Sequence, residues 1–145
     1  TLITLKQEGK IMKTEDLYKG FDKGLEYRKE ASERWGEGKV KESEEKLAAL
    51  GKEGFEKLKR EGEEINTLLA DLMHLPPGND SVQHVIELHF KHIGTFRELT
   101  TESYGTLGKM YVDDERFKAT YDKVKPGLAK FLNEGIQLFC KNRKA

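Results

Sequence analysis

The stretch from Glu102 to Phe131 decides the fold of this chain, and it reads E-S-Y-G-T-L-G-K-M-Y-V-D-D-E-R-F-K-A-T-Y-D-K-V-K-P-G-L-A-K-F. Within it, Tyr104, Leu107 and Tyr111 recur at steps of three and four residues, the spacing that places side chains on one face of an α-helix. Three large side chains on one face need an apolar partner to cover them. The stretch therefore predicts a helix that packs into a core.

Two glycines and an acidic run refine this prediction. Gly105 and Gly108 leave an adjacent strip of the helix thin, so a neighbouring element or a ligand can approach its backbone closely. Asp113 or Asp114 is suited to cap the start of the next helix. The three adjacent carboxylates of residues 113–115 could also suggest a cation site, but a cap with favourable dipole charges is the simpler interpretation.

The rest of the stretch predicts two helices separated by a proline. The first has Phe117, Tyr121 and Val124 on its inner face. Residues 125–127, K-P-G, end it, because proline cannot donate a backbone hydrogen bond and disfavours helical geometry in the residue before it. The closing helix is marked by the apolar residues Leu128, Phe131, Leu132, Ile136 and Phe139.

Further helices are predicted upstream. Gly51 begins a long helix with the apolar stripe Phe55, Leu58, Gly62, Ile65, Leu69 and Leu72. After the turn L-P-P-G-N-D, Asp80 or Ser81 caps a helix whose stripe is Val82, Ile86, His89, Ile93 and Phe96. We find no alternating β-branched run that would predict a strand. The fold class is therefore all-α, a bundle or a globin-like packing.

The N-terminal third is also predicted to be helical, but it has few large apolar residues. Thr14 is suited to cap a short helix with Leu17, Tyr18 and Phe21, and residues 25–35 and 39–50 are candidate helices. Such helices are marginal alone and need something to pack against. The chain begins without methionine and looks cut from a longer protein.

The amino-acid composition limits the classes of protein to which this chain can belong. The 145 residues suffice for one domain with a real core. Lys and Arg number 26, as do Asp and Glu, and neither half of the chain has the basic excess of a phosphate-binding surface. The single cysteine, Cys140, excludes an internal disulfide and fits a reducing cytoplasm. The apolar runs are too short to span a membrane. We therefore expect a cytoplasmic domain that contacts neither nucleic acid nor membrane itself.

Catalytic and metal-binding motifs find no support. His89 and His92 are three apart, and no cysteine or carboxylate completes a ligand set at a recognisable spacing. No G-x-S-x-G elbow, phosphate loop or cysteine–histidine pair occurs, and Cys140 reads as a packing residue. His89 interrupts an apolar stripe, so it is a core histidine, a residue lining a ligand cavity, or a haem ligand. We favour core or cavity lining and predict no catalytic residue, metal or cofactor.

The aromatic residues suggest a binding role. Large aromatic side chains are numerous for a chain with few apolar residues, and they include Tyr27, Trp35, Phe55, Phe96, Tyr104, Tyr111 and Phe117. Most belong to the core, but a subset lining a concavity would suit a large, flat, apolar ligand. The weakly apolar N-terminal third would then be a lid that becomes ordered when ligand supplies the missing core.

Three blocks together resemble a known family. They are Y-R-K-E-A-S-E-R-W-G at 27–36, L-G-K-M-Y-V-D-D-E-R-F at 107–117 and K-P-G-L-A-K-F-L at 125–132. They are similar to the TipAS family, the antibiotic-recognition domain at the C-terminus of MerR-type transcriptional activators. The resemblance extends from about Glu15 to Cys140. The opening residues are similar to the join between the MerR dimerisation helix and this domain.

The resemblance implies an all-helical, globin-like effector domain without enzymatic turnover or haem, whose mobile N-terminal helices close over a cleft. It implies recognition of a bulky apolar antibiotic or drug, and DNA binding only through a missing N-terminal domain of a homodimeric regulator. Residues 1–12 would end the dimerisation helix and linker, and residues 13–145 would form the ligand-binding domain. Residues 13–50 would be its lid and 51–145 its core.

One departure bears on the binding chemistry. Thiopeptide-binding members of the family carry two cysteines seven apart, and one of them attacks the ligand. Those places are held here by Leu99 and Thr106. A threonine hydroxyl is a far weaker nucleophile than a thiolate. We therefore predict reversible binding.

The predicted site combines lid and core. Leu99, Ser103 and Thr106 are spaced to share one helical face. The candidate ligand-binding residues are Tyr27, Trp35, His89, Phe96, Leu99, Ser103, Tyr104, Thr106 and Tyr111. Two alternatives remain at this point: a stand-alone protein that sequesters drugs, and a haem- or metal-binding helical protein that uses His89.

Overall fold

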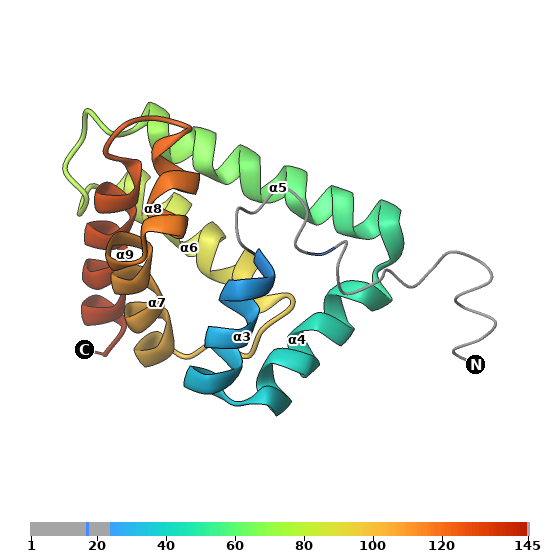
Figure 1. Ribbon diagram of the computed structural model, residues 1–145. Helices are drawn as coiled ribbons and strands as arrows, with labels where there is room; N and C mark the ends of the chain where they lie inside the picture. Colours follow the sequence, from blue (N-terminus) through green and yellow to red (C-terminus); the bar gives the residue numbers. More distant parts are fainter. Residues whose placement is uncertain (1–16, 18–23, 145) are drawn as a thin grey trace. The chain divides into compact units, whose positions relative to one another are not determined.

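The computed structural model describes Leu17 and residues 24–144, with the backbone alone for residues 24, 25, 27 and 144. Between residues 24 and 144 the chain forms helices throughout and contains no strand (Figure 1). The helices are α3 (Gly24–Trp35), α4 (Glu37–Ala49), α5 (Gly51–Asp71), α6 (Asp80–Gly94), α7 (Thr101–Asp113), α8 (Glu115–Asp122) and α9 (Leu128–Lys144). The all-α class is confirmed. Two predicted segments lie outside the described residues. They are the helix that begins at Thr14, apart from Leu17, and the end of the dimerisation helix.

The chain divides into two compact units, residues 1–60 and 61–145, and the boundary lies within α5. The predicted border between lid and core, near residue 50, instead coincides with the junction of α4 and α5. There the backbone of Gly51 has a φ of 74°, a left-handed conformation that glycine adopts without steric cost. The assignment of these parts as lid and core stays a prediction.

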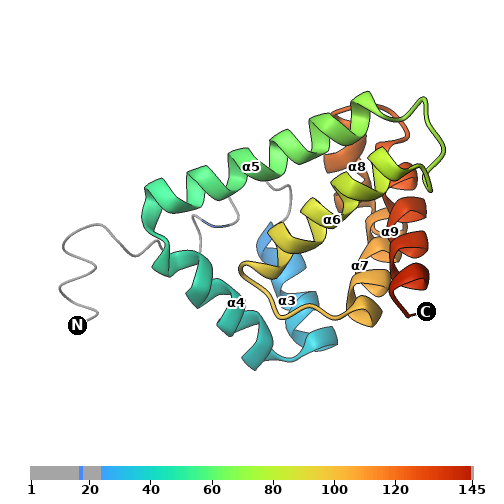
Figure 2. The ribbon, with the colours of Figure 1, turned by 180° about the vertical axis from the view of Figure 1, so that it is seen from behind.

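In the first unit, α3 and α4 form a hairpin that Figures 1 and 2 show from opposite sides. Gly36 joins them with a φ of 97°. The Arg28 guanidinium on α3 donates from Nε to Glu44 Oε2 at 2.7 Å and from Nη2 to Glu44 Oε1 at 2.9 Å. Glu44 lies on α4 and is buried. Arg28 also donates to Glu37 at 2.8 Å. A carboxylate buried between these helices is thus held by a two-point charged contact.

In the second unit, glycines allow α9 to pack closely against two neighbours, α7 and α6, at one contact each. A Cβ added at Gly108 of α7 would lie 3.0 Å from Cγ2 of Ile136 on α9. A Cβ added at Gly135 of α9 would lie 2.9 Å from Cδ1 of Ile86 on α6. The close approach predicted at Gly108 is therefore confirmed, and the element that approaches is α9. Both ribbon views show α7 and α9 side by side (Figure 2).

The N-terminal caps of two helices, α8 and α6, can be compared with the predicted ones. Asp114 caps α8, as predicted, and its side chain accepts from the backbone N–H of Arg116. The predicted cap of α6, Asp80 or Ser81, is wrong by one residue. Asn79 is the cap, and its Oδ1 accepts from the backbone N–H of Ser81 at 2.9 Å.

The core of the second unit follows the predicted stripes closely. Its largest fully buried side chains are Tyr104, Leu69, Ile86, Leu128, Leu132, Ile136 and Val82. The inward placement of Val124 is wrong, because α8 ends at Asp122 and Val124 is 46% exposed in the turn that follows. None of the helices in the described ranges is both long and apolar enough to cross a membrane.

Candidate ligand-binding site

A hydrogen-bonded pair of rings joins α6 to α7 in the second unit. His89 Nδ1 lies 2.7 Å from the hydroxyl oxygen of Tyr104. That hydroxyl donates to the backbone carbonyl of Ile86, one turn earlier on α6, at 3.3 Å. His89 is 3% exposed and Tyr104 is fully buried. The predicted core histidine is therefore confirmed as buried, and its polar partner is a tyrosine from the neighbouring helix.

Burial sets the charge of this pair. Burial, together with the nearby positive charge of His92, lowers the pKa of His89 to about 3. Burial likewise raises the pKa of the Tyr104 hydroxyl well above its ordinary value of 10. Both groups are therefore uncharged at neutral pH, so the contact between them is a hydrogen bond between neutral groups and not an ion pair.

Aromatic rings continue from this pair in both directions. The ring of Tyr111 meets His89 edge-on, with centroids 6.1 Å apart, and lies 4.8 Å from the ring of Tyr121. On the other side Tyr104 packs edge-on against Phe139, 5.8 Å away, and against Phe90, 5.0 Å away. The three predicted residues His89, Tyr104 and Tyr111 are thus brought together in one aromatic cluster.

The hydroxyls of Tyr111 and Tyr121 also interact. A side-chain hydrogen bond links them. Burial raises the pKa of Tyr121 to about 12 and that of Tyr111 well above its ordinary value. A second uncharged polar contact is therefore enclosed in the same cluster, between α7 and α8.

The predicted shared face of Leu99, Ser103 and Thr106 does not form. Helix α7 begins at Thr101, with Thr100 as its cap, so Leu99 lies before the helix. The side chains of Thr100 and Ser103 form a reciprocal capping box, in which each accepts a hydrogen bond from the other's backbone N–H. The face was mispredicted because the sequence before Thr100 carries no strong helix-stop signal.

Two further predicted residues occupy exposed or turn positions. Thr106 is exposed, and its hydroxyl donates to the carbonyl of Glu102, one turn back, at 3.2 Å. Helix α6 ends at Gly94, so the predicted place of Phe96 on its stripe is wrong. Phe96 is half-buried in the following turn, with its ring edge-on to His92 at 6.2 Å.

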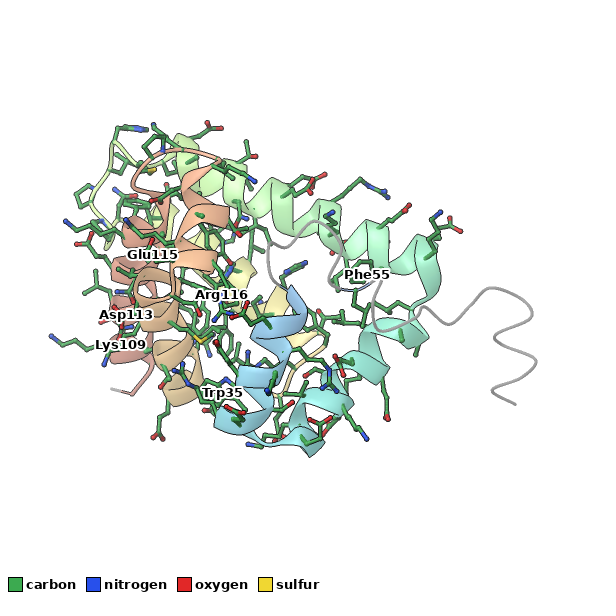
Figure 3. All side chains as sticks on the ribbon, in the orientation of Figure 1. Trp35, Phe55, Lys109, Asp113, Glu115 and Arg116 are labelled. Atoms are coloured by element: carbon green, nitrogen blue, oxygen red, sulfur yellow. The ribbon has the colours of Figure 1, made fainter. Side chains whose placement is uncertain are left out.

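The predicted residues of the N-terminal third belong to the first unit. Trp35 is half-buried and ends α3, as Figure 3 shows. Tyr27 is part of the backbone of α3, but its side chain lies outside the described residues. Three residues outside the predicted ligand-binding set also contribute rings to the cluster: Tyr121 and Phe139, which were predicted as inward-facing helix residues, and Phe90, which was not predicted. Phe90 could have been found, since it is four residues after the buried Ile86 and therefore on the same helical face.

The acidic run at the α7–α8 junction acts as a cap. Asp114 accepts from Nε of Arg116 at 3.0 Å and from Nη2 at 2.8 Å (Figure 3 labels Arg116). These bonds hold the pKa of the Asp114 carboxyl below its ordinary value. Among the described residues, no group of three or more His, Cys, Asp or Glu side chains could hold a metal ion.

Cys140 on α9 is buried, and its thiol contacts the backbone of α7. Sγ donates to the carbonyl of Thr101 at 3.0 Å. This contact fits the predicted packing role.

Comparisons with known proteins agree with this architecture. The sequence model of the TipAS antibiotic-recognition domain matches residues 27–139. The transcriptional activator TipA of Streptomyces coelicolor, of the HTH type, is 32% identical over 115 residues, which are 77% of this chain and 46% of that protein. The HTH-type activator mta of Bacillus subtilis is 26% identical over 143 residues, 94% of this chain and 56% of that protein. The chain thus spans about half the length of these relatives.

A solved structure gives the same result in three dimensions. TipAS from Streptomyces lividans, in complex with the thiopeptide antibiotic nosiheptide, superposes with a TM-score of 0.77 and 29% sequence identity. The match covers 90% of this chain and 93% of that one. A family match over most of the chain and a shared fold lead to one conclusion: the chain belongs to the TipAS antibiotic-recognition domain family.

Proposed function

We propose that this chain is a non-catalytic effector domain that binds a bulky, largely apolar antibiotic, with thiopeptides as the first class to test. The observation that carries this proposal is the likeness to TipAS in complex with nosiheptide, at a TM-score of 0.77 over 90% of the chain. The aromatic cluster around His89 and Tyr104 supports it, because large rings with few polar groups suit a flat apolar ligand.

The ligand-contact residues proposed from the sequence fall into two groups, those whose mutual contacts support the proposal and those without such contacts. His89, Tyr104 and Tyr111 are supported by their mutual contacts, which form an uncharged, buried aromatic cluster with hydroxyl and imidazole groups. The remaining six stay proposed without such support: Tyr27, Trp35, Phe96, Leu99, Ser103 and Thr106.

Binding is proposed to be reversible. The resemblance places the family's two cysteines at positions 99 and 106, which are leucine and threonine here. The Thr106 hydroxyl already donates its proton to a backbone carbonyl, and such an alcohol is a weak nucleophile. Cys140, the chain's one cysteine, is buried. Covalent capture of a dehydroalanine-containing ligand is therefore not expected.

In the whole protein, this domain follows a DNA-binding half, dimerises through a helix near its start and works in the cytoplasm as a transcriptional regulator. The support is that the curated relatives are HTH-type regulators and that the chain spans about half of their length. Ligand occupancy would then be transmitted to promoter DNA.

A thermal-shift titration with nosiheptide tests the binding proposal. A ligand that binds the folded state at 100 times its Kd adds about 2.7 kcal/mol to the unfolding free energy, which gives a clear, dose-dependent rise in Tm. An unrelated peptide of similar mass serves as the control. Intact-mass analysis of the complex should give the mass of the unmodified protein. A flat titration up to the solubility limit would count against thiopeptide recognition, and a stable adduct would count against reversibility.

A further inference from the structure

The turn between α8 and α9 concentrates positive charge around one exposed valine. Residues 117–130 include four lysines and a single acidic residue, Asp122. Asp122 is already engaged, because its Oδ1 accepts from the backbone N–H of Ala129, in the first turn of α9, at 3.0 Å. Val124 lies in the middle of this segment and is 46% exposed. The exposed residues of this basic turn are Lys118, Lys123, Val124, Lys125 and Lys130.

The second half of α5 carries the opposite charge around one exposed leucine. Residues 61–73 contain four carboxylates and no lysine or arginine. Glu64, Leu68 and Asp71 follow one another at steps of four and three, which places them on one face of the helix. Leu68 is 46% exposed. The exposed residues of this acidic face are Glu61, Glu64, Leu68 and Asp71.

The basic turn and the acidic face border each other within the second unit. Lys125 donates from Nζ to the carbonyl of Ala70, near the end of α5, at 3.4 Å. A Cβ added at Gly127 would lie 3.4 Å from Cε of Met73, just beyond α5. Both ribbon views show the turn beside the C-terminal end of α5 (Figures 1 and 2). Opposite charges are therefore presented side by side, each set with its own exposed apolar residue.

The fold of the chain does not account for these charges. Among the residues that the structure describes, no ion pair involves a lysine of the basic turn or a carboxylate of the acidic face. Two of the charges also lie at the unfavourable end of a helix dipole. Asp71 is the last residue of α5, and Lys130 lies in the first turn of α9. These charges are therefore available to a partner.

A partner for this surface must carry charges of both signs. A nucleic acid or an anionic membrane would be attracted by the lysines but repelled by the neighbouring carboxylates. A second copy of this chain, related by a two-fold axis, offers the complementary arrangement, because each surface then meets its opposite on the other copy. Leu68 and Val124 meet across such an interface, and both lose solvent exposure.

We propose that two copies of this chain associate through a two-fold contact in which the basic turn of each lies on the acidic face of the other. This contact is separate from the helix near the start of the chain that is proposed to join the whole regulator. Exposed ion pairs contribute little individually, so the contact is weak between separate chains. It becomes effective where that helix holds two domains at a high local concentration, and there it orients them.

Sedimentation equilibrium of the 145-residue chain tests the contact. At low ionic strength, protein concentrations from micromolar to near-millimolar should give a monomer–dimer equilibrium. Raising the ionic strength from about 0.01 M to about 1 M shortens the Debye length from about 30 Å to about 3 Å. The Kd of the dimer should then rise at least about tenfold. The measurement uses no antibiotic, so its result is independent of the proposed ligand.

Charge reversal tests the two-fold pairing. Lys123→Glu combined with Lys130→Glu makes the turn acidic, and Glu64→Lys combined with Asp71→Lys makes the face of α5 basic. Each double variant alone should self-associate at least about tenfold more weakly than the wild type, because like charges then meet. An equal mixture of the two should associate about as tightly as the wild type, since both contacts of the mixed dimer again join opposite charges.

A matched control changes the net charge equally at a different place. Lys109→Glu combined with Lys141→Glu alters exposed lysines of α7 and α9 outside both surfaces, and this variant should dimerise like the wild type. Circular dichroism checks that every variant is folded.

Four results would overturn the proposal. They are a wild type that stays monomeric at near-millimolar concentration and low ionic strength, a dimer that the reversals leave intact, a control variant that weakens association equally, and reversed variants that do not associate when mixed. A monomer that instead binds duplex DNA or phosphatidylserine vesicles, and loses this binding in the Lys123→Glu, Lys130→Glu variant, would assign the basic turn to a polyanion.

Discussion

Gly108 of α7 and Ile136 of α9 meet so closely that a Cβ at position 108 would lie 3.0 Å from Cγ2 and 3.2 Å from Cβ of the isoleucine. Gly108→Ala is therefore expected to lower the unfolding free energy by about 1–3 kcal/mol, because the β-branched neighbour cannot move aside without shifting its helix. Urea denaturation followed by circular dichroism measures the change.

Gly105→Ala, one helical turn away on α7, is the matched control. Its Cβ would make ordinary contacts, 3.5 Å from Gln137 Oε1 and 3.8 Å from Cys140 Sγ. Since alanine is favoured over glycine within a helix, this variant should be unchanged or up to about 1 kcal/mol more stable. Equal losses in the two variants would mean that the contact with Ile136 does not set the cost.

The buried histidine makes stability depend on pH. Burial lowers the pKa of His89 to about 3, whereas its ordinary value is 6.5. Between these values the unfolded chain binds a proton that the folded protein excludes. The contribution of His89 is therefore constant above pH 6.5 and falls as the pH is lowered, by at most about 1.4 kcal/mol per pH unit.

His89→Gln isolates this effect, since the carboxylates titrate alike in both proteins. The unfolding free energy of the wild type, measured by urea denaturation at several pH values between 6.5 and 4, should fall more steeply than that of the variant. Parallel curves for the two proteins would rule out a proton-linked cost at this residue.

The α3–α4 hairpin should depend on the contact between Arg28 and buried Glu44. Arg28→Ala removes both hydrogen bonds to this carboxylate and should destabilise the hairpin by about 1–2 kcal/mol. Hydrogen exchange of the α3 and α4 amides measures the local effect. Glu37→Ala removes only the more exposed partner of Arg28 and should leave exchange nearly unchanged. The prediction fails if both variants exchange alike.

Substitutions at Ser103 and Thr106 distinguish a helix-capping role from a ligand-binding role. Ser103→Ala breaks the capping box of α7 and should cost about 1 kcal/mol of stability. Thr106→Ala removes an exposed hydroxyl and should leave stability within about 0.5 kcal/mol. Calorimetric titration with nosiheptide then shows whether either residue contacts the ligand. A fall in affinity that exceeds the stability loss identifies a contact.

Local sequence signals predicted the helices well where spacing and caps agreed. The steps from Tyr104 to Tyr111 and the cap at Asp114 were read correctly, because both depend on residues within one or two turns. Prediction failed near the ends of helices. Val124 and Phe96 continue an apolar spacing past the last helical residue, and periodicity alone does not say where a helix stops.

The candidate site was predictable only in part. A histidine within an apolar stripe signals a buried polar group, so His89 could be chosen from the sequence. Its bond to Tyr104 could not, because the two residues lie on different helices, α6 and α7, which both pack against α9. That packing depends on tertiary contacts that no local pattern encodes.

The distribution of aromatic residues also gives each unit its own optical signal. The chain has a single tryptophan, Trp35, which lies in the first unit, whereas the buried tyrosines Tyr104, Tyr111 and Tyr121 lie in the second. Indole fluorescence therefore reports on residues 1–60, and the near-ultraviolet tyrosine bands are dominated by residues 61–145. Recording both signals during one denaturation experiment would resolve, without any label, whether the antibiotic stabilises one unit or both.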